Sequence, residues 1–210
     1  MPNLWKVSRP RFWIYVLGPY LLGVAALIHQ GLALEHLWQL LVFGVYFTFP
    51  ANLFIYGVND IYDFETDKHN EKKQGYEHIL PIAAHRKLAR VIAMVNLPFL
   101  IAGVFILPVP ALVGLATFVF LGAGYSAPPR FKTIPFLDSL SNILYIMPAL
   151  VSFGWLGYPP ALVLVAGGCW SMAMHAYSAA PDISADTTAG MKTIATALRL
   201  KGTLAFCGLL

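Results

Sequence analysis

Four oxygen-bearing side chains recur within about two helical turns near residue 60, and they belong to Asn59, Asp60, Asp63 and Asp67. A helix turns by about 100° per residue, so Asn59, Asp63 and Asp67 recur every four residues and Asp60 lies about 20° from Asp67. All four side chains are therefore predicted to share an arc of about 100°. Glu65 lies between them in the sequence but points elsewhere on such a helix.

A second acidic pair, Asp182 and Asp186, stands one helical turn apart after a long apolar stretch. Carboxylates this close repel one another unless a cation lies among them. Ligands that are all oxygen, with no cysteine or partnered histidine, favour a hard cation such as Mg²⁺ or Ca²⁺. The alternative is that acidic residues only cap helix ends in a solvated loop, and the presence of two motifs disfavours it. We therefore predict a Mg²⁺ site made by Asn59, Asp63, Asp67, Asp182 and Asp186.

Basic side chains accompany both acidic motifs. Residues 125–132 read Tyr-Ser-Ala-Pro-Pro-Arg-Phe-Lys and supply Arg130 and Lys132, while Lys192 follows the second acidic pair. A diphosphate held between Mg²⁺ and Arg or Lys donors needs this mixture, because the charge of the leaving group grows as its C–O bond breaks. Ordinary membrane anchoring is the alternative, and we infer it for the remaining dispersed cations Lys87, Arg90, Arg199 and Lys201.

The elements that must position these residues are membrane-spanning helices. The chain is 58% hydrophobic and only 11% charged, whereas soluble domains are about 25% charged. Apolar runs long enough to cross a bilayer recur along the whole chain. The predicted spans cover 12–28, 38–58, 91–107, 111–127, 139–157 and 161–179, and a further apolar run begins near 203. Prolines inside spans, such as Pro50, Pro98 and Pro148, are tolerated in a bilayer, because neighbouring helices satisfy the freed backbone groups.

The placement of charge predicts the topology. All 14 Lys and Arg residues lie in segments on one side of the predicted spans, namely the N-terminal segment, 59–90, 128–138 and 180–201. The connections on the other side contain a single charged residue, Glu35. By the positive-inside tendency, the N-terminus and both aspartate motifs are predicted to face the cytoplasm.

These motifs, in this order, resemble the UbiA-type intramembrane aromatic prenyltransferases. Residues 59–67 match the NDxxDxxxD motif of that family, 125–132 match YSxPxRxK, and 182–193 match DxxxDxxxGxxT. Ser8-Arg9-Pro10 is also similar to the family's N-terminal segment. The chain departs from the family at 72–78, where Lys-Lys-Gln-Gly-Tyr-Glu-His stands in place of a stretch that usually carries proline and arginine.

The resemblance implies an all-α transmembrane bundle, one membrane-embedded domain over residues 1–210, with a central cavity open to lipid. In that family both aspartate motifs bind Mg²⁺ and a prenyl diphosphate, here dimethylallyl diphosphate or a longer donor. The diphosphate leaves, and the allylic cation alkylates a lipophilic acceptor within the bilayer. We expect catalytic roles for Asp60, Asp63, Asp67, Asp182 and Asp186. We expect substrate binding by Asn59, Tyr125, Ser126, Arg130, Lys132, Lys192 and Arg9.

Two further segments, 8–13 and 175–182, resemble the lycopene elongase branch, which adds five-carbon units to the ends of a carotenoid. A quinone precursor or a tetrapyrrole is the alternative acceptor. His175 is a candidate acceptor for the proton lost after alkylation, although a lone histidine at a helix end is more often packed or hydrogen-bonded. The family usually has more spans than this chain, so the sequence predicts six complete spans, a truncated seventh and an incomplete C-terminus.

Two other functions compete with prenyl transfer. A CDP-alcohol phosphotransferase also places aspartates at a membrane surface, but the DG and AR elements of its motif are missing, since Phe64 follows Asp63. A transporter or channel would place its carboxylates near the bilayer midplane and use paired broken helices, whereas these carboxylates lie at span ends. Nucleic-acid binding is disfavoured because the basic residues are dispersed beside the spans.

Overall fold

The computed structural model describes residues 3–64, 81–157, 161–188 and 190–210, and within these ranges every regular element is a helix. The longer helices are α2 (Ile14–His29), α3 (Leu37–Tyr46), α4 (Phe49–Tyr62), α7 (Ile82–Ile106), α8 (Val109–Ser126), α10 (Met147–Phe153), α11 (Ala161–Ala179) and α13 (Ile194–Leu209). The short elements are α1 (Leu4–Val7), η1 (Pro10–Phe12), η2 (Phe131–Thr133), α9 (Leu137–Leu140), η3 (Ser141–Ile146), η4 (Gly154–Leu156), η5 (Ala180–Asp182) and α12 (Ile183–Thr188).

The described helices include five segments that are long and apolar enough to cross a membrane. These segments are Leu37–Tyr62, Ile82–Ile106, Val109–Ser126, Leu137–Leu156 and Ala161–Thr188. A sixth is formed if Leu4–Phe12 and Ile14–His29, which meet at 59°, are taken as one bent span. The prediction of an all-helical transmembrane bundle is confirmed, and the chain is an integral multi-pass membrane protein.

The second span, predicted over 38–58, consists of two helices that together form one apolar segment, Leu37–Tyr62. Helix α3 ends at Tyr46, and α4 begins at Phe49 with Pro50 in its first turn. Proline has no backbone N–H and is compatible with the first turn of a helix but not with its interior. The side chain of Asn52 donates a hydrogen bond to the Thr48 carbonyl oxygen (2.6 Å), and this bond satisfies a backbone acceptor at the break between the two helices.

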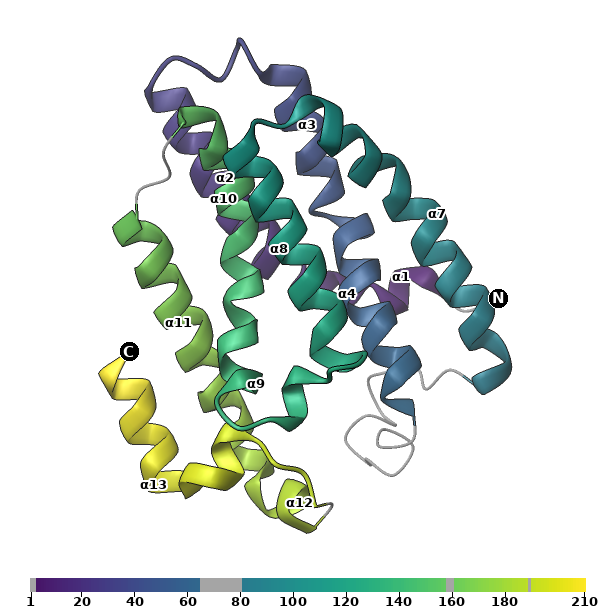
Figure 1. The fold of residues 1–210 in the computed structure, drawn as a ribbon, viewed down its shortest axis with the longest axis vertical. Coiled ribbons are helices and arrows are strands. Elements are labelled where there is room, and N and C mark those ends of the chain that lie inside the picture. Colours follow the sequence, from purple (N-terminus) through teal and green to yellow (C-terminus); the bar gives the residue numbers. More distant parts are fainter. Residues whose placement is uncertain (1–2, 65–80, 158–160, 189) are drawn as a thin grey trace.

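The C-terminal ends of α4 and α8 lie toward the same end of the bundle as α9 and α12 (Figure 1). Helix α10 packs against both α2 and α8, α4 packs against α7, and α11 packs against η3 and α13. Small residues permit this close packing, as in membrane helix pairs generally. A Cβ atom on Gly154 would lie 2.5 Å from the backbone nitrogen of Ala111.

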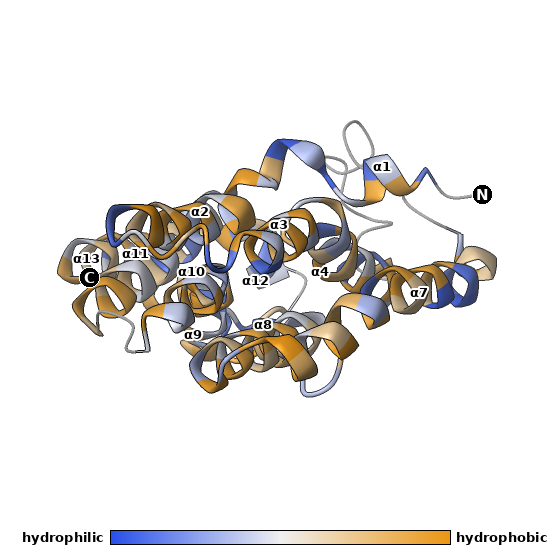
Figure 2. Cartoon of the chain, turned by 90° about the horizontal axis from the view of Figure 1, so that it is seen from above, coloured by the Kyte–Doolittle hydropathy of each residue, from blue (hydrophilic) through white to orange (hydrophobic). Residues whose placement is uncertain are grey.

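Hydrophobic residues make up much of the helices (Figure 2), and many large apolar side chains are exposed on the outside of the bundle. On α7 these include Met94, Val104 and Phe105, which are 73%, 61% and 82% exposed. Such helix surfaces suit the hydrocarbon core of a bilayer, because contact of apolar side chains with lipid carries no desolvation penalty. Several buried polar side chains, among them Asp63, Ser126 and Asp138, lie at helix ends, and these ends position the candidate site.

Candidate active site

The carboxylate of Asp63 is the centre of a polar cluster between α4 and α8. Asp63 follows the last residue of α4, and its side chain is only 2% exposed. The Asn59 side-chain amide donates to Asp63 Oδ2 (2.5 Å) and to Ser126 Oγ (2.9 Å). The Ser126 hydroxyl in turn donates to Asp63 Oδ2 (3.3 Å). The structure therefore brings the first acidic motif into contact with the 125–132 segment.

Two cations approach the other oxygen of this carboxylate. Lys132 Nζ forms an ion pair with Asp63 Oδ1, and Arg130 Nη2 lies 3.7 Å from the same oxygen. Lys132 is largely buried (12% exposed), whereas Arg130 is 40% exposed. Both cations are thus held beside a buried carboxylate and are close enough to contact an anion bound at the same place.

The turn after α8 aims these cations. Arg130 has a left-handed backbone (φ 61°), and η2 follows at once with Lys132 in its centre. Phe131 between them is buried against α8, where a Cβ atom on Gly124 would lie 2.6 Å from its ring. Anchoring of Phe131 in the core directs its two neighbours away from the core, and this is why Arg130 and Lys132 meet the same carboxylate.

Asp60 has a separate partner. Arg9 Nη2 donates to Asp60 Oδ1 at 2.8 Å, and both side chains are 13% exposed. The Arg9 guanidinium also lies over the Tyr56 ring, 4.8 Å from its centroid. The first acidic motif therefore has two ion-paired positions with different cationic partners, Arg9 at Asp60 and Lys132 at Asp63. Asp67 lies outside the described residues.

The second acidic pair lies on η5 and α12. Asp182 and Asp186 are both half-buried, and the Asp186 carboxyl interacts electrostatically with Asp182, Asp138 and Lys132. Lys132 therefore acts on carboxylates of both acidic motifs. Lys192 is exposed and directly precedes Thr193, the N-cap of α13.

The described residues do not form a cluster of three or more carboxylate, histidine or cysteine side chains around one point. Basic side chains compensate part of the acidic charge instead, as at Asp63. The donor set nevertheless fits a hard cation, because the motif residues offer only carboxylate and amide oxygens. The half-buried Asp182 and Asp186 also repel one another, and a cation between them would relieve that repulsion.

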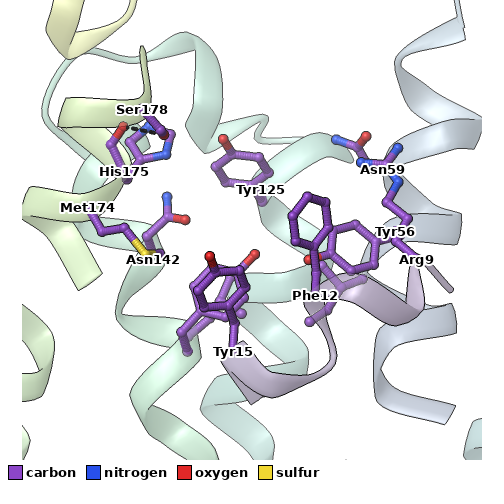
Figure 3. A pocket seen from close by; sticks show the side chains of 13 residues that line it. Arg9, Phe12, Tyr15, Tyr56, Asn59, Tyr125, Asn142, Met174, His175 and Ser178 are labelled. Atoms are coloured by element: carbon purple, nitrogen blue, oxygen red, sulfur yellow. Dashed lines mark hydrogen bonds between the residues drawn. The ribbon is translucent and has the colours of Figure 1, made fainter. Parts of the chain in front are cut away.

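A cavity of about 400 Å³ adjoins this cluster (Figure 3). Aromatic side chains make up much of its wall, and the lining residues are Arg9, Phe12, Tyr15, Ile55, Tyr56, Asn59, Tyr125, Asn142, Leu144, Tyr145, Met174, His175 and Ser178. Three predicted site residues, Arg9, Asn59 and Tyr125, thus line one cavity. The cavity is lined by polar groups at the Asn59 end and by a mixed wall near His175 (Figure 3).

Several cavity and neighbouring residues were missed in the sequence. Tyr15, Tyr56 and Tyr145 are common residue types in apolar spans, so nothing in the local sequence distinguished them. Asp138 did carry a signal, because an ionisable residue at the start of an apolar span is a candidate functional residue. It is completely buried, and His175 Nε2 lies 3.6 Å from its Oδ2.

Relatives with similar sequences are known. The chain matches the model of the UbiA prenyltransferase family over residues 16–210. It is 41% identical to a lycopene elongase/hydratase of Halobacterium salinarum, and the match covers 97% of this chain and 74% of that protein. It is 33% identical to a lycopene elongase/hydratase of Corynebacterium glutamicum, over 94% of this chain and 69% of that protein.

Solved structures share the fold. A UbiA homolog from Archaeoglobus fulgidus bound to GPP and Mg²⁺ superimposes with a TM-score of 0.74 at 20% identity, over 98% of this chain and 72% of that chain. The same homolog bound to DMAPP and Mg²⁺ gives a TM-score of 0.69, over 99% and 75%. The resemblance inferred from the motifs is thereby confirmed, and the transporter alternative is set aside. The chain belongs to the UbiA prenyltransferase family and is a membrane-embedded prenyltransferase.

Proposed function

We propose that this enzyme transfers a dimethylallyl group from its diphosphate to an end of lycopene, in a Mg²⁺-dependent reaction within the bilayer. The observation that carries the proposal is the juxtaposition of two features. A cluster of acidic and basic groups around Asp63 adjoins a cavity lined by Phe12, Tyr15, Tyr56 and Tyr145. A diphosphate requires the first feature, and a reactive allylic cation requires the second.

Lys132 and Arg130 have the charge and the position to stabilise the leaving group. As the C–O bond breaks, negative charge accumulates on the diphosphate, and preorganised cations stabilise it more than they stabilise the intact substrate. Asp63 holds both cations in place before substrate binds. Arg9, which lines the cavity beside Asn59, supplies a third cationic contact from the N-terminal segment.

The residues proposed to hold Mg²⁺ are Asn59, Asp63, Asp67, Asp182 and Asp186. The bound ion would neutralise phosphate charge and favour departure of the diphosphate. The protein's own part is to present oxygen ligands from both motifs at one end of the bundle. Asp60 contributes by holding Arg9.

The cavity wall suits a carbocation. An aromatic face attracts positive charge, and a site that excludes water prevents premature capture of the cation. Phe12 contacts both Tyr15 and Tyr56 (ring centroids 5.9 Å apart in each case), and Tyr15 lies 6.4 Å from Tyr145. These rings enclose the space next to Asn59, where the allylic end of the donor would lie.

Lycopene is proposed as the acceptor because the curated relatives are named lycopene elongase/hydratase and share 41% and 33% of residues with this chain. Physical reasoning alone leaves a quinone precursor or a tetrapyrrole open, since an apolar wall would accept either. A long polyene would place only one end in a cavity of about 400 Å³ and leave the rest in lipid.

Expression in a host that accumulates lycopene tests the proposal. We expect a carotenoid heavier by one or two five-carbon units, detected by liquid chromatography and mass spectrometry. In isolated membranes, removal of divalent ions with a chelator should abolish formation of this product, and Mg²⁺ should restore it. Unchanged lycopene in the presence of membrane-inserted protein would refute lycopene as acceptor.

We also propose that the N-terminus and both acidic motifs face the cytoplasm, because the basic residues cluster on that side. In a variant whose native cysteines are replaced by alanine, Gln30→Cys and Lys192→Cys probe opposite sides. A membrane-impermeant thiol reagent should label Gln30→Cys on intact cells and should label Lys192→Cys only after lysis. The reverse pattern would invert the topology.

A further inference from the structure

A histidine and a buried carboxylate form a pair at the side of the cavity away from Arg9. His175, on α11, lines the cavity and is 15% exposed. Its Nε2 lies 3.6 Å from Oδ2 of Asp138, which is completely buried. In Figure 3, His175 lies with Asn142 and Met174 on one side of the cavity, whereas Arg9 and Asn59 lie on the other.

One hydrogen bond to the carboxylate of Asp138 and one to its backbone hold this residue in place. Its Oδ2 accepts a hydrogen bond from the backbone N–H of Ile194 (2.7 Å), the first residue of α13. A helix N-terminus favours negative charge. The Asn142 side chain donates to the Asp138 backbone oxygen (2.6 Å). Among the described residues, Oδ1 of Asp138 has no hydrogen-bond partner. A buried carboxylate with an unsatisfied oxygen next to an imidazole is arranged to stabilise positive charge on that imidazole.

The reaction leaves a proton to be removed. When C1 of the dimethylallyl group bonds to a terminal alkene carbon of the acceptor, the positive charge moves to the adjacent tertiary carbon. The C–H bond beside that carbon then breaks, its electron pair forms a new C=C bond, and the proton must be accepted by a base. The diphosphate has already left with the electrons of its C–O bond.

We propose that His175 accepts this proton and that Asp138 is the residue that positions His175 and stabilises its charged form. The inference rests on the function proposed above. If the N–H of Nε2 faces Asp138, the lone pair is on Nδ1, and a fixed tautomer of this kind is how carboxylates prepare histidines for proton transfer. Among the described residues that line the cavity, His175 is the only imidazole and no carboxylate is present.

The released diphosphate is the competing base. It would be held by Lys132 and Arg130 beside Asp63 and by Arg9, which lies across the cavity from His175 (Figure 3). A base across the cavity from Arg9 lets the cation lose its proton at the acceptor end, where the charge resides after alkylation. If His175 is the base, replacing His175 should strongly reduce alkene formation. If the diphosphate is the base, the same replacement should leave alkene formation unchanged.

The test separates release of diphosphate from formation of alkene. Membranes that contain wild-type enzyme, His175→Gln or Asp138→Asn are incubated with lycopene, dimethylallyl diphosphate and Mg²⁺, and diphosphate and carotenoid products are quantified in the same samples. Asp138→Asn keeps an oxygen that can accept the Ile194 N–H but loses the charge. His29→Gln, an exposed position at the end of α2, is the matched control.

For His175→Gln we expect diphosphate release to persist while the yield of elongated alkene per diphosphate falls by about a hundredfold, the lower end of general-base effects. Water-captured alcohol should accumulate instead. Asp138→Asn should lower the same ratio less severely, and His29→Gln should leave it unchanged. Added imidazole should partly restore alkene formation in His175→Ala.

Two outcomes would overturn the inference while the proposed function stands. An unchanged ratio in both variants would make the diphosphate the base. Equal loss of diphosphate release and alkene in folded His175→Gln would place His175 in substrate binding or ionisation. Absence of any elongated carotenoid from the wild-type enzyme would refute the proposed function itself, and the inference with it.

Discussion

Substitution of Lys132 by methionine removes one charge from the site and keeps the length of the side chain. Lys132 is 12% exposed and pairs with Asp63, which is 2% exposed. Removing one partner from a fully buried ion pair costs about 3–5 kcal/mol of stability, because the other charge is left buried. Here Arg130, Ser126 and Asn59 still contact the carboxylate, so we expect a loss of about 2 kcal/mol.

The expected effect on catalysis is larger than the effect on folding. Loss of one preorganised donor to a developing anion lowers kcat by about 10²–10³-fold. We therefore expect Lys132→Met to release diphosphate about a hundredfold more slowly at saturating donor. Lys201→Met, at an exposed position on α13, is the control and should leave both stability and rate unchanged.

A double variant separates the two effects. Lys132→Met combined with Asp63→Asn leaves no buried charge without a partner, since Arg130 is 40% exposed, so most of the lost stability should return. Activity should stay low, because the double variant lacks both the cation that faces the leaving group and a proposed Mg²⁺ ligand. Stability is measured as thermal unfolding in detergent by tryptophan fluorescence, and activity is measured as diphosphate release. Recovery of activity in the double variant, or Lys132→Met within threefold of wild type, would refute the proposed contact with the diphosphate.

Three further predictions concern other parts of the molecule. Asp63→Ala and Asp182→Ala should each abolish product formation while membrane insertion persists; near-normal turnover by either variant, in fractions shown to contain it, would remove that residue from the catalytic set. Arg9→Met loses the 2.8 Å contact with Asp60 and should lower the free energy of unfolding by about 1 kcal/mol. It should also raise KM for the prenyl donor, and an unchanged KM would mean that the Arg9–Asp60 pair has a structural role only. Gly154→Val places a side chain against Ala111 backbone and should lower the unfolding temperature in detergent, since overpacking costs about 1–3 kcal/mol; an unchanged temperature would show that the helices can separate at no cost.

Much of the architecture was predictable because a bilayer constrains sequence strongly. Each span must be apolar over its length and must satisfy its own backbone hydrogen bonds, so the spans could be delimited by composition alone. The break between α3 and α4 was not predicted, although Pro50 marks it. Proline inside a span is compatible with either a continuous or a broken helix, and only contacts such as that of Asn52 with Thr48 decide between them.

The chemistry of the site was predictable in kind. Carboxylates at helical spacing, together with Arg130 and Lys132, indicate a bound cation and a phosphorylated ligand, because such charges are unfavourable without counter-charges. The partners of each charge were not predictable. Helical periodicity within one segment says nothing of a partner from another, and the partner of Asp60 is Arg9, 51 residues away in the sequence.

The sequence by itself determined that this protein spans a membrane, that its acidic motifs lie at span ends, and that it has the motifs of a prenyltransferase. These properties depend on composition and on spacing within one helix, which are local. Only the tertiary structure brought Asp138 to His175 and Lys132 to Asp63. Such contacts depend on how separate helices pack, and the pairing of buried charges is set by that packing.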